Sequence, residues 1–259
     1  VDTVGENEKR DLFLSGEKRY TAKQENFSKI PGMPVAYWVS EAVQYAFSNG
    51  VVLKKIAEPK QGMVTRDNNR FMRLWWETGF NRMALAVYSH KESEISDKKW
   101  YPCTSGGAYR KWYGNLESVV NFEHDGKEII AFSGSHIKNR EYYFRESITW
   151  SAISSSKLSM RYVPKGFLPE HAGNCLYCSS EQLSLLQAFS NSIVGLHFLG
   201  ILSPTLNYNV GDIASLPIIK PNADILDSIT EITNELRTDS KNDYDSFETS
   251  WDFERHPLI

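Results

Sequence analysis

The chain has 259 residues, of which 41% are hydrophobic and 24% charged, and these values favour a folded globular protein over a disordered one. The formal net charge of −3 argues against an indiscriminate nucleic-acid binder. The charge is nevertheless unevenly distributed. Ten acids stand against three bases after Lys220, and the remaining 26 bases and 22 acids give residues 1–220 a net charge of +4. The sequence therefore predicts a mildly basic body and an acidic tail.

The first 50 residues predict a polar lead-in followed by one helix. Residues 1–30 are charged and show little periodicity, which is typical of a linker or of the end of a preceding unit. Pro34 suits the first turn of a helix, apolar residues then recur every three or four positions, and Gly50 ends the pattern. From Val51 to Tyr177 short β-rich runs are separated by Gly, Asn and Asp. The best strand candidates are RLWWETGF (73–80), ESVVNFEH (117–124), KEIIAF (127–132), EYYFRESITW (141–150) and LSMRYVPKGF (158–167).

Two further helices are predicted in the last third of the chain. Residues 181–202 are apolar along one side and polar along the other, which favours a long buried helix over a membrane span. Residues 222–237 carry acids in the first turn and an apolar seam that would suit packing on a partner helix. The seam consists of Ile225, Ile229, Ile232 and Leu236.

These elements predict an α+β fold in three parts. We expect residues 1–50 to be a lead-in segment and helix, and residues 221–259 to be a C-terminal helix and acidic tail. Residues 51–220 should form one β-rich domain with a long buried helix. Its shared core should include Trp76, Phe144, Trp150, Phe189 and Leu196.

Motifs of catalysis are scarce. The chain contains no Gly-x-Gly-x-x-Gly, no Walker A loop and no Gly-x-Ser-x-Gly. Cys175 and Cys178 form a single C-x-x-C with His171 upstream, but a structural zinc ion needs four ligands, so packing of small apolar cysteines is the better interpretation. We therefore expect no catalytic residue, metal site or cofactor in this chain. Three cysteines, an odd number, favour a reducing cytoplasmic location.

Basic residues gather beside aromatic ones in two places. The first is TRDNNRF (65–71) with its continuation, and the second runs from Lys98 to Asn115. Lys and Arg neutralise phosphates, whereas Arg and Asn can read base edges. The sequence thus predicts DNA contacts from two loops on one surface. The candidate residues are Arg66, Asn68, Asn69, Arg70, Arg73, Lys98, Lys99, Arg110, Lys111, Trp112, Tyr113 and Asn115.

Each of these features also has a purely structural interpretation. Asn68 and Asn69 could form a tight turn, because Asn tolerates left-handed backbone. One ring of the pair Trp75 and Trp76 should enter the core, since successive side chains of a strand point to opposite faces. The segment RKWY (110–113) could be an edge strand with a buried Trp112.

Seven segments, in order, resemble one family. They are IPGMPVAYWVSEAVQYAF, VTRDNNRFMRLWWE, KKWYPCTSGGAYRKWYGN, YYFRESITWSAISS, RYVPKGF, LSPTLNYNVGDIASLPI and DYDSFETSWDFERHPL. Together they are similar to the C-terminal half of the PglX-like adenine-specific DNA methyltransferases of BREX phage-defence systems, which themselves resemble type IIG restriction-modification enzymes. The family usually reads Thr-Gly-Asp-Asn where this chain has Thr65-Arg66-Asp67-Asn68, so an arginine replaces a turn glycine.

The resemblance implies a target-recognition domain that binds double-stranded DNA. In the family, methyl transfer belongs to another domain with an Asn-Pro-Pro-Tyr motif and S-adenosylmethionine, and this chain has no Pro-Pro dipeptide. We therefore expect a piece of a longer methyltransferase, partnered by the methyltransferase domain of the same polypeptide and not by a membrane. Other phage-defence partners and DNA cleavage by the longer protein stay open. The alternatives are a carbohydrate or other small-ligand module and an unrecognised nuclease.

Overall fold

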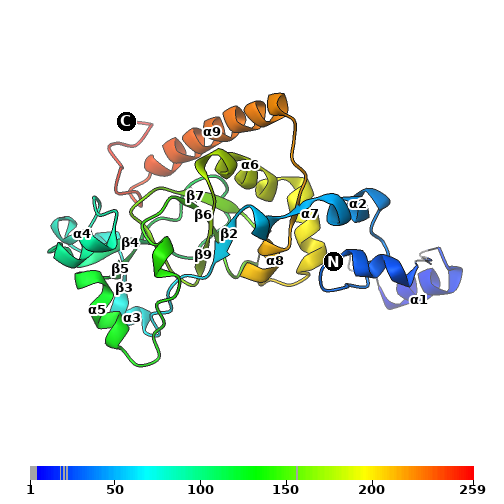
Figure 1. The fold of residues 1–259 in the computed structure, drawn as a ribbon, viewed down its shortest axis with the longest axis horizontal. Helices are drawn as coiled ribbons and strands as arrows, with labels where there is room; N and C mark the ends of the chain where they lie inside the picture. The colour runs from blue at the N-terminus through cyan, green and yellow to red at the C-terminus, as the bar shows by residue number, and fades with distance from the viewer. Residues whose placement is uncertain (1–4, 18, 20, 22, 156) are drawn as a thin grey trace.

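The computed structural model describes every residue except 1–4, 18, 20, 22 and 156, and it confirms the expected α+β fold (Figure 1). The helices are α1 (Glu6–Ser15), α2 (Glu41–Asn49), α3 (Asn68–Phe71), α4 (His90–Ile95), α5 (Glu123–Ala131), α6 (Ser180–Asn191), α7 (Ile193–Leu202), α8 (Val210–Ala214) and α9 (Ala223–Asp245). The strands are β1 (Val51–Val52), β2 (Glu58–Lys60), β3 (Met72–Leu74), β4 (Trp100–Thr104), β5 (Ser118–Asn121), β6 (Ser147–Ser151), β7 (Met160–Val163), β8 (Leu168–Pro169), β9 (Gly173–Tyr177) and β10 (Pro217–Ile218).

The centre of the molecule is an antiparallel sheet in the order β2-β9-β6-β7. Ile148 of β6 stands opposite Leu176 of β9, and both are fully buried. Apolar residues of α2, α6 and α7 join this sheet in the largest core cluster, which includes Trp150 at 0% exposure. Figure 1 shows α6 along one side of the sheet and α7 and α2 at its right-hand end.

A second sheet, in the order β3-β5-β4-β8, forms the left part of the molecule in Figure 1. Its inner face carries Tyr101 and Val120, which pair across β4 and β5 and pack with Phe122 and Phe144 in a separate core cluster. Helices α4 and α5 lie beside this sheet. The opposite face of the same strands carries Arg73, which stands opposite Val119.

The two sheets are built from both halves of the chain. Strand β2 lies early in the sequence and pairs with β9, whereas β8 lies late and pairs in parallel with β4. Residues 51–150 and 151–220 are therefore not two independent globules. The assignment of residues 51–220 as the recognition domain stays a prediction.

The predicted helix at 181–202 is divided into α6 and α7. Ser192 between them has extended backbone, and its hydroxyl accepts a hydrogen bond from the Gly195 amide at 3.0 Å, so it caps α7. Among the described residues no single helix is long and apolar enough to cross a membrane. Helices α6 and α7 reach the required length and apolar character only when taken together, and they meet at a 72° bend.

Three other sequence expectations are wrong in detail. The run KEIIAF belongs to α5 and not to a strand, and α2 begins after a Ser40 cap and not at Pro34. Trp76 is 46% exposed, and its neighbour Trp75 packs inward and donates its indole N–H to the Thr249 carbonyl. Phe144 and Trp150 are both buried, and Phe189 and Leu196 are partly buried against the cluster of Trp150. Phe144 belongs to the separate cluster of the second sheet, so the expected single shared core is divided into two.

Helix α9 is longer than predicted, because it ends at Asp245 and not at residue 237. It begins at an Asn222 cap, whose side chain accepts from the Ile225 amide, and it runs along α6 at the top of Figure 1. Ile225 and Ile232 of the predicted seam are more than half exposed. The helix packs on the body through other residues, including Thr233 and Tyr244, which are buried.

Candidate nucleic-acid interface

The first basic segment forms a capped turn that ends in α3. The Asp67 carboxylate accepts a hydrogen bond from the Arg70 amide at 3.0 Å, and Asn68 accepts one from the Thr65 hydroxyl. Phe71, at 0% exposure, anchors the turn in the core. Arg66 has a φ of 65°, in the left-handed region that favours glycine. The turn therefore keeps a glycine-like backbone although an arginine occupies the position.

Arg70 ties this turn to α5. Its Nε and Nη2 atoms donate to Glu128 Oε1 at 3.0 and 2.6 Å, and Asn121 of β5 donates to Glu128 Oε2 at 2.8 Å. The hydrogen bonds from the Arg70 guanidinium lower the pKa of Glu128. Both side chains stay about half exposed, so the pair orients Arg70 without removing it from solvent.

Arg73 of β3 and Lys99, which directly precedes β4, approach the same aromatic ring. The Arg73 Cζ atom lies 5.7 Å from the ring centroid of Trp100, and the Lys99 Nζ atom lies 6.0 Å from it. Lys99 also contributes to the lowered pKa of Glu128, which places it near the Arg70 pair. We use the term basic face for this region. It consists of Arg66, Asn69, Arg70, Arg73, Lys98 and Lys99.

Two members of the basic face have additional backbone contacts. Arg73 donates to the carbonyls of Asn69 and Met72, and Lys98 donates to the Asn81 carbonyl at 3.0 Å. These contacts use carbonyl oxygens, which neutralise no charge. Lys98 also forms an ion pair with Asp97 at 3.1 Å, as Arg70 does with Glu128. Among the described residues, Arg66, Arg73 and Lys99 are the cations of the basic face that form no ion pair with a carboxylate.

The second basic segment, residues 106–115, directs its cations at α9 and α6. The Arg110 guanidinium donates to Asp243 of α9 at 3.1 Å and lies over the Tyr244 ring, and Lys111 donates to the Asn191 carbonyl at 2.7 Å. The Trp112 amide donates to the Met160 carbonyl, and the Trp112 carbonyl accepts from the Tyr162 amide, so both backbone groups of Trp112 bond to β7. The segment therefore joins the body to α9 and α6.

The rest of this segment is held by similar contacts. Tyr113 is buried edge-on against Tyr244, and burial raises its pKa to about 12. Asn115 donates to the Ala108 carbonyl at 2.8 Å, which closes the turn. The interpretation of RKWY as a packed edge segment fits these contacts better than an exposed DNA-binding loop.

The structure does not bring the two predicted loops onto one surface. Arg110 contacts the C-terminal part of α9, whereas Arg70 contacts α5, and Figure 1 shows α9 and the α3–α5 pair at opposite edges of the molecule. The expectation of one surface is wrong because an acidic helix covers the second loop. The structure instead groups the first loop with Lys98 and Lys99.

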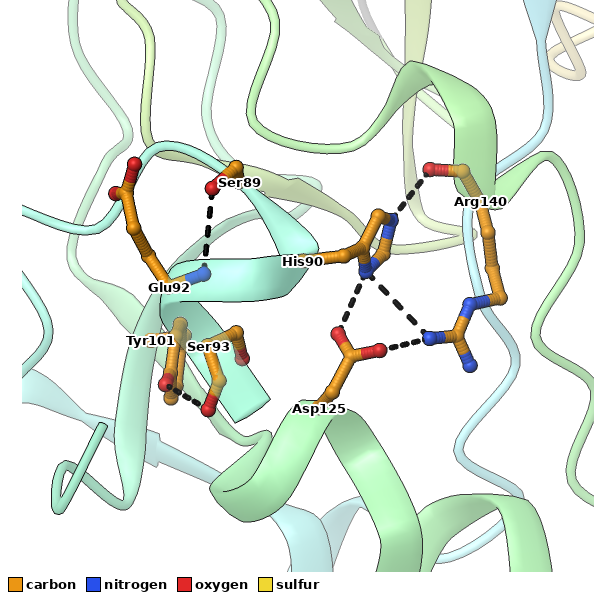
Figure 2. Close-up of polar contacts among 7 residues, drawn as sticks. All are labelled: Ser89, His90, Glu92, Ser93, Tyr101, Asp125 and Arg140. Carbon is orange, nitrogen blue, oxygen red and sulfur yellow. Dashed lines mark hydrogen bonds and ion pairs between the residues drawn. The ribbon is translucent and has the colours of Figure 1, made fainter. Parts of the chain in front are cut away.

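A polar cluster that was not foreseen from the sequence connects α4 to α5 (Figure 2). His90 Nδ1 lies 2.6 Å from Asp125 Oδ1, Arg140 forms an ion pair with the other oxygen of Asp125, and His90 Nε2 lies 2.9 Å from the Arg140 carbonyl. Both ring nitrogens of His90 are thus engaged within the protein. The cluster positions helices beside the basic face, and no nitrogen of His90 is left to act as a base.

The sequence carried one signal for this cluster. His124, Asp125 and Gly126 all have left-handed backbone, with φ between 51° and 78°, a conformation that Asp and Gly tolerate better than most residues. This turn starts α5 and presents Asp125 to two partners from distant parts of the chain.

The cysteines lie in separate packed environments. Cys103 and Cys175 are buried, and burial raises the pKa of both thiols. Burial likewise raises the pKa of Cys178 to about 11. Within the described part of the chain, no group of three or more His, Cys, Asp or Glu side chains could hold a metal ion.

The whole chain is similar to parts of two longer proteins. It is 36% identical over 277 residues to the adenine-specific methyltransferase PglX of Lacticaseibacillus casei (strain Zhang), and 34% identical over 266 residues to the adenine-specific methyltransferase BrxX of Escherichia coli O9:H4 (strain HS). The chain is homologous to a segment of the PglX-like methyltransferases. The resemblance found in the ordered motifs is thereby confirmed. No family model matches the chain.

The chain spans 22% of the length of PglX and 21% of that of BrxX. Because each similarity covers 100% of this chain, the basic face, the 106–115 segment and α9 all fall within the shared region. The elements described above therefore correspond to one segment of PglX and of BrxX.

Proposed function

We propose that this segment recognises double-stranded DNA for an adenine-N6 DNA methyltransferase that acts in phage defence. The observation that supports it most is the basic face. Arg70 of α3, Arg73 of β3 and Lys99, just before β4, gather within a region homologous to PglX and BrxX. Phosphate contacts from such cations position a duplex, and a few neighbouring side chains specify the sequence.

The geometry of the basic face suits a backbone-gripping surface. Its cations stand on a buried sheet and a capped turn, so their positions are set before DNA arrives and less side-chain entropy is lost on binding. Asn69 is exposed on the same turn, and its amide can both donate to and accept from a base edge. We assign phosphate contacts to Arg73, Lys98 and Lys99, and base or phosphate contacts to Arg66, Asn69 and Arg70.

The second segment has another task in this proposal. Arg110 and Lys111 hold α9 and α6 to the body, and their charges are directed at Asp243 and a backbone carbonyl. Asn68 and Asn115 shape their turns. We therefore restrict the DNA-binding surface to the basic face, which is narrower than the sequence predicted.

Methyl transfer would take place outside this segment. An enzyme that modifies adenine in a duplex must extrude the base, so another part of the protein has to hold the DNA and select the site. The chain has no Asn-Pro-Pro-Tyr sequence, and we place the S-adenosylmethionine site in the remainder of the longer protein. Being tethered to that domain raises the effective concentration of DNA, so a modest basic excess suffices.

The test is a titration of a labelled duplex with the chain, monitored by fluorescence anisotropy and repeated at several salt concentrations. If four cations contact phosphates, affinity should fall roughly a hundredfold between about 50 and 200 mM salt. The triple variant Arg70→Ala/Arg73→Ala/Lys99→Ala should bind weakly at every salt concentration. Salt-independent binding of an oligosaccharide, or metal-dependent cleavage of the duplex, would favour the carbohydrate or nuclease alternative instead.

A further inference from the structure

A cleft of about 470 Å³ lies between α9 and the body. Its walls come from the C-terminal half of α9, the tail that follows it, the segment after β7, and Phe80, Leu85 and Pro102 at the second sheet. We call it the α9 cleft. Its volume falls in the range of small-ligand sites, which are concave, largely apolar and carry a few polar groups.

Aromatic rings form most of the apolar wall. Phe167 and Trp251 pack together with centroids 5.7 Å apart and planes inclined by 32°. Tyr113 and Tyr162 line the other side, and both are held in place, Tyr113 by Tyr244 and Tyr162 by a 2.8 Å hydrogen bond to Glu146. Phe167 and Tyr113 are buried, whereas Tyr162 and Trp251 are partly exposed. The partly exposed rings are the ones that suit stacking of a planar heterocycle.

Cations are placed beside the aromatic rings. Arg237 stacks over the Tyr162 ring at 4.9 Å, and its Nε donates to Gln187 Oε1 at 2.5 Å, so its direction is fixed by α6. Lys241 lies 5.4 Å from the Tyr113 ring centroid and donates to Asp252 at 3.2 Å. Lys165 is exposed at the margin.

The charge of the lining favours an anion. Lys165, Arg237 and Lys241 line the cleft together with one acid, Asp252. No ion pair of Lys165 or Arg237 with a carboxylate occurs among the described residues, whereas Lys241 is shared between Asp245 and Asp252. A ligand with a phosphate near Lys165 and Arg237 would therefore gain charge-assisted hydrogen bonds without displacing a protein carboxylate.

We propose that the α9 cleft binds a free mononucleotide, with the base against the aromatic wall and the phosphate toward Lys165 and Arg237. The adjoining aromatic and cationic walls account for both halves of such a ligand, and neither wall is part of the basic face. Binding would link the tail at Trp251 to the body, because the cleft includes residues from both.

The experiment is isothermal titration calorimetry of the 259-residue chain with adenosine 5′-monophosphate at moderate salt. Adenosine and inorganic phosphate serve as half-ligands, and each should bind at least tenfold more weakly than the nucleotide, since each loses one wall. A short single-stranded oligonucleotide is titrated separately. Tighter binding of the oligonucleotide than of the mononucleotide would overturn the assignment to a free nucleotide.

Lys165→Ala is the decisive variant, because Lys165 is exposed and its loss should leave the fold intact. It should weaken nucleotide binding about tenfold, the loss expected for a hydrogen bond to a charged group. The matched control is Lys91→Ala, an exposed lysine on α4, which should bind the nucleotide normally. Equal affinity in the two variants, or no saturable binding to the wild-type chain, would refute the site. Duplex binding, measured on the same variants, reports separately on the basic face.

Discussion

Segments 65–73 and 106–115 have similar compositions and opposite surroundings. Both combine cations, aromatic rings and turn residues. The first keeps its arginines at the surface beside one carboxylate, Glu128, which is itself about half exposed. The second contacts Asp243 and Tyr244 of α9, and its Arg110 forms a partly exposed ion pair with Asp243. The comparison teaches that the composition of a basic-aromatic segment does not decide whether its cations are available to a ligand, because an acidic element of the same protein can pair with them.

The largest expected effect concerns the contact between the second segment and α9. Tyr244 is 5% exposed, packs on Tyr113, and accepts a hydrogen bond from the Leu116 amide at 3.3 Å. Tyr244→Ala should lower the free energy of unfolding by about 3 to 5 kcal/mol, as for other large buried aromatic residues. Urea denaturation measures this, with Tyr244→Phe as the control that keeps the ring. A loss below about 1 kcal/mol in the alanine variant would show that α9 is only loosely attached.

The next prediction separates the two segments by function. Arg73→Ala in the basic face should reduce duplex affinity roughly tenfold, the effect of about 1.4 kcal/mol expected from one good DNA contact. Arg110→Ala should leave duplex affinity unchanged and lower stability by no more than about 1 kcal/mol, because its ion pair is partly exposed. Anisotropy titrations at one fixed salt concentration compare the two. The reverse ranking would restore the 106–115 segment as the DNA-binding loop.

The third prediction concerns Arg66, whose side chain adds a positive charge at a position with strained, left-handed backbone. Its left-handed φ of 65° disfavours any side chain, so Arg66→Gly should leave stability unchanged or raise it by up to about 1 kcal/mol. The same change should weaken duplex binding a few-fold and reduce the salt slope by about 0.9, the loss of one phosphate contact. Thermal unfolding and salt-dependent anisotropy measure the two effects. An unchanged salt slope would exclude Arg66 from the basic face.

The smallest effect concerns pH. The Arg70 guanidinium lowers the folded-state pKa of Glu128, so this pair stabilises the protein above the unfolded pKa near 4.5, and that contribution is lost as the pH falls through the lower folded value. Because both groups are about half exposed, the contribution should be only about 0.5 kcal/mol. Glu128→Gln should remove this part of the acid dependence in urea denaturation between about pH 3 and 6. An acid dependence identical to that of the wild type would show that the pair contributes nothing.

Several features followed from local sequence alone. The acids of the first turn and the apolar spacing predicted the start of α9, and the β-rich runs ESVVNFEH and LSMRYVPKGF predicted β5 and β7. The order of seven motifs indicated a resemblance to the PglX-like proteins, which the similarity of the whole chain to a segment of PglX and BrxX confirmed. These predictions succeed because caps, alternation and motif order depend on neighbouring residues.

Other features depended on partners far along the chain. KEIIAF lies in helix α5, which follows a left-handed turn at Asp125. The carboxylate of Asp125 contacts His90, which comes earlier in the chain, and Arg140, which comes later. The Arg110 guanidinium is directed at α9 because Asp243, 133 positions away in the sequence, accepts its hydrogen bond. By itself, then, the sequence determined the family, the mixed fold class and the positions of the basic residues. Which of those residues face solvent was decided by tertiary packing, since a side chain's surroundings depend on the elements that fold against it.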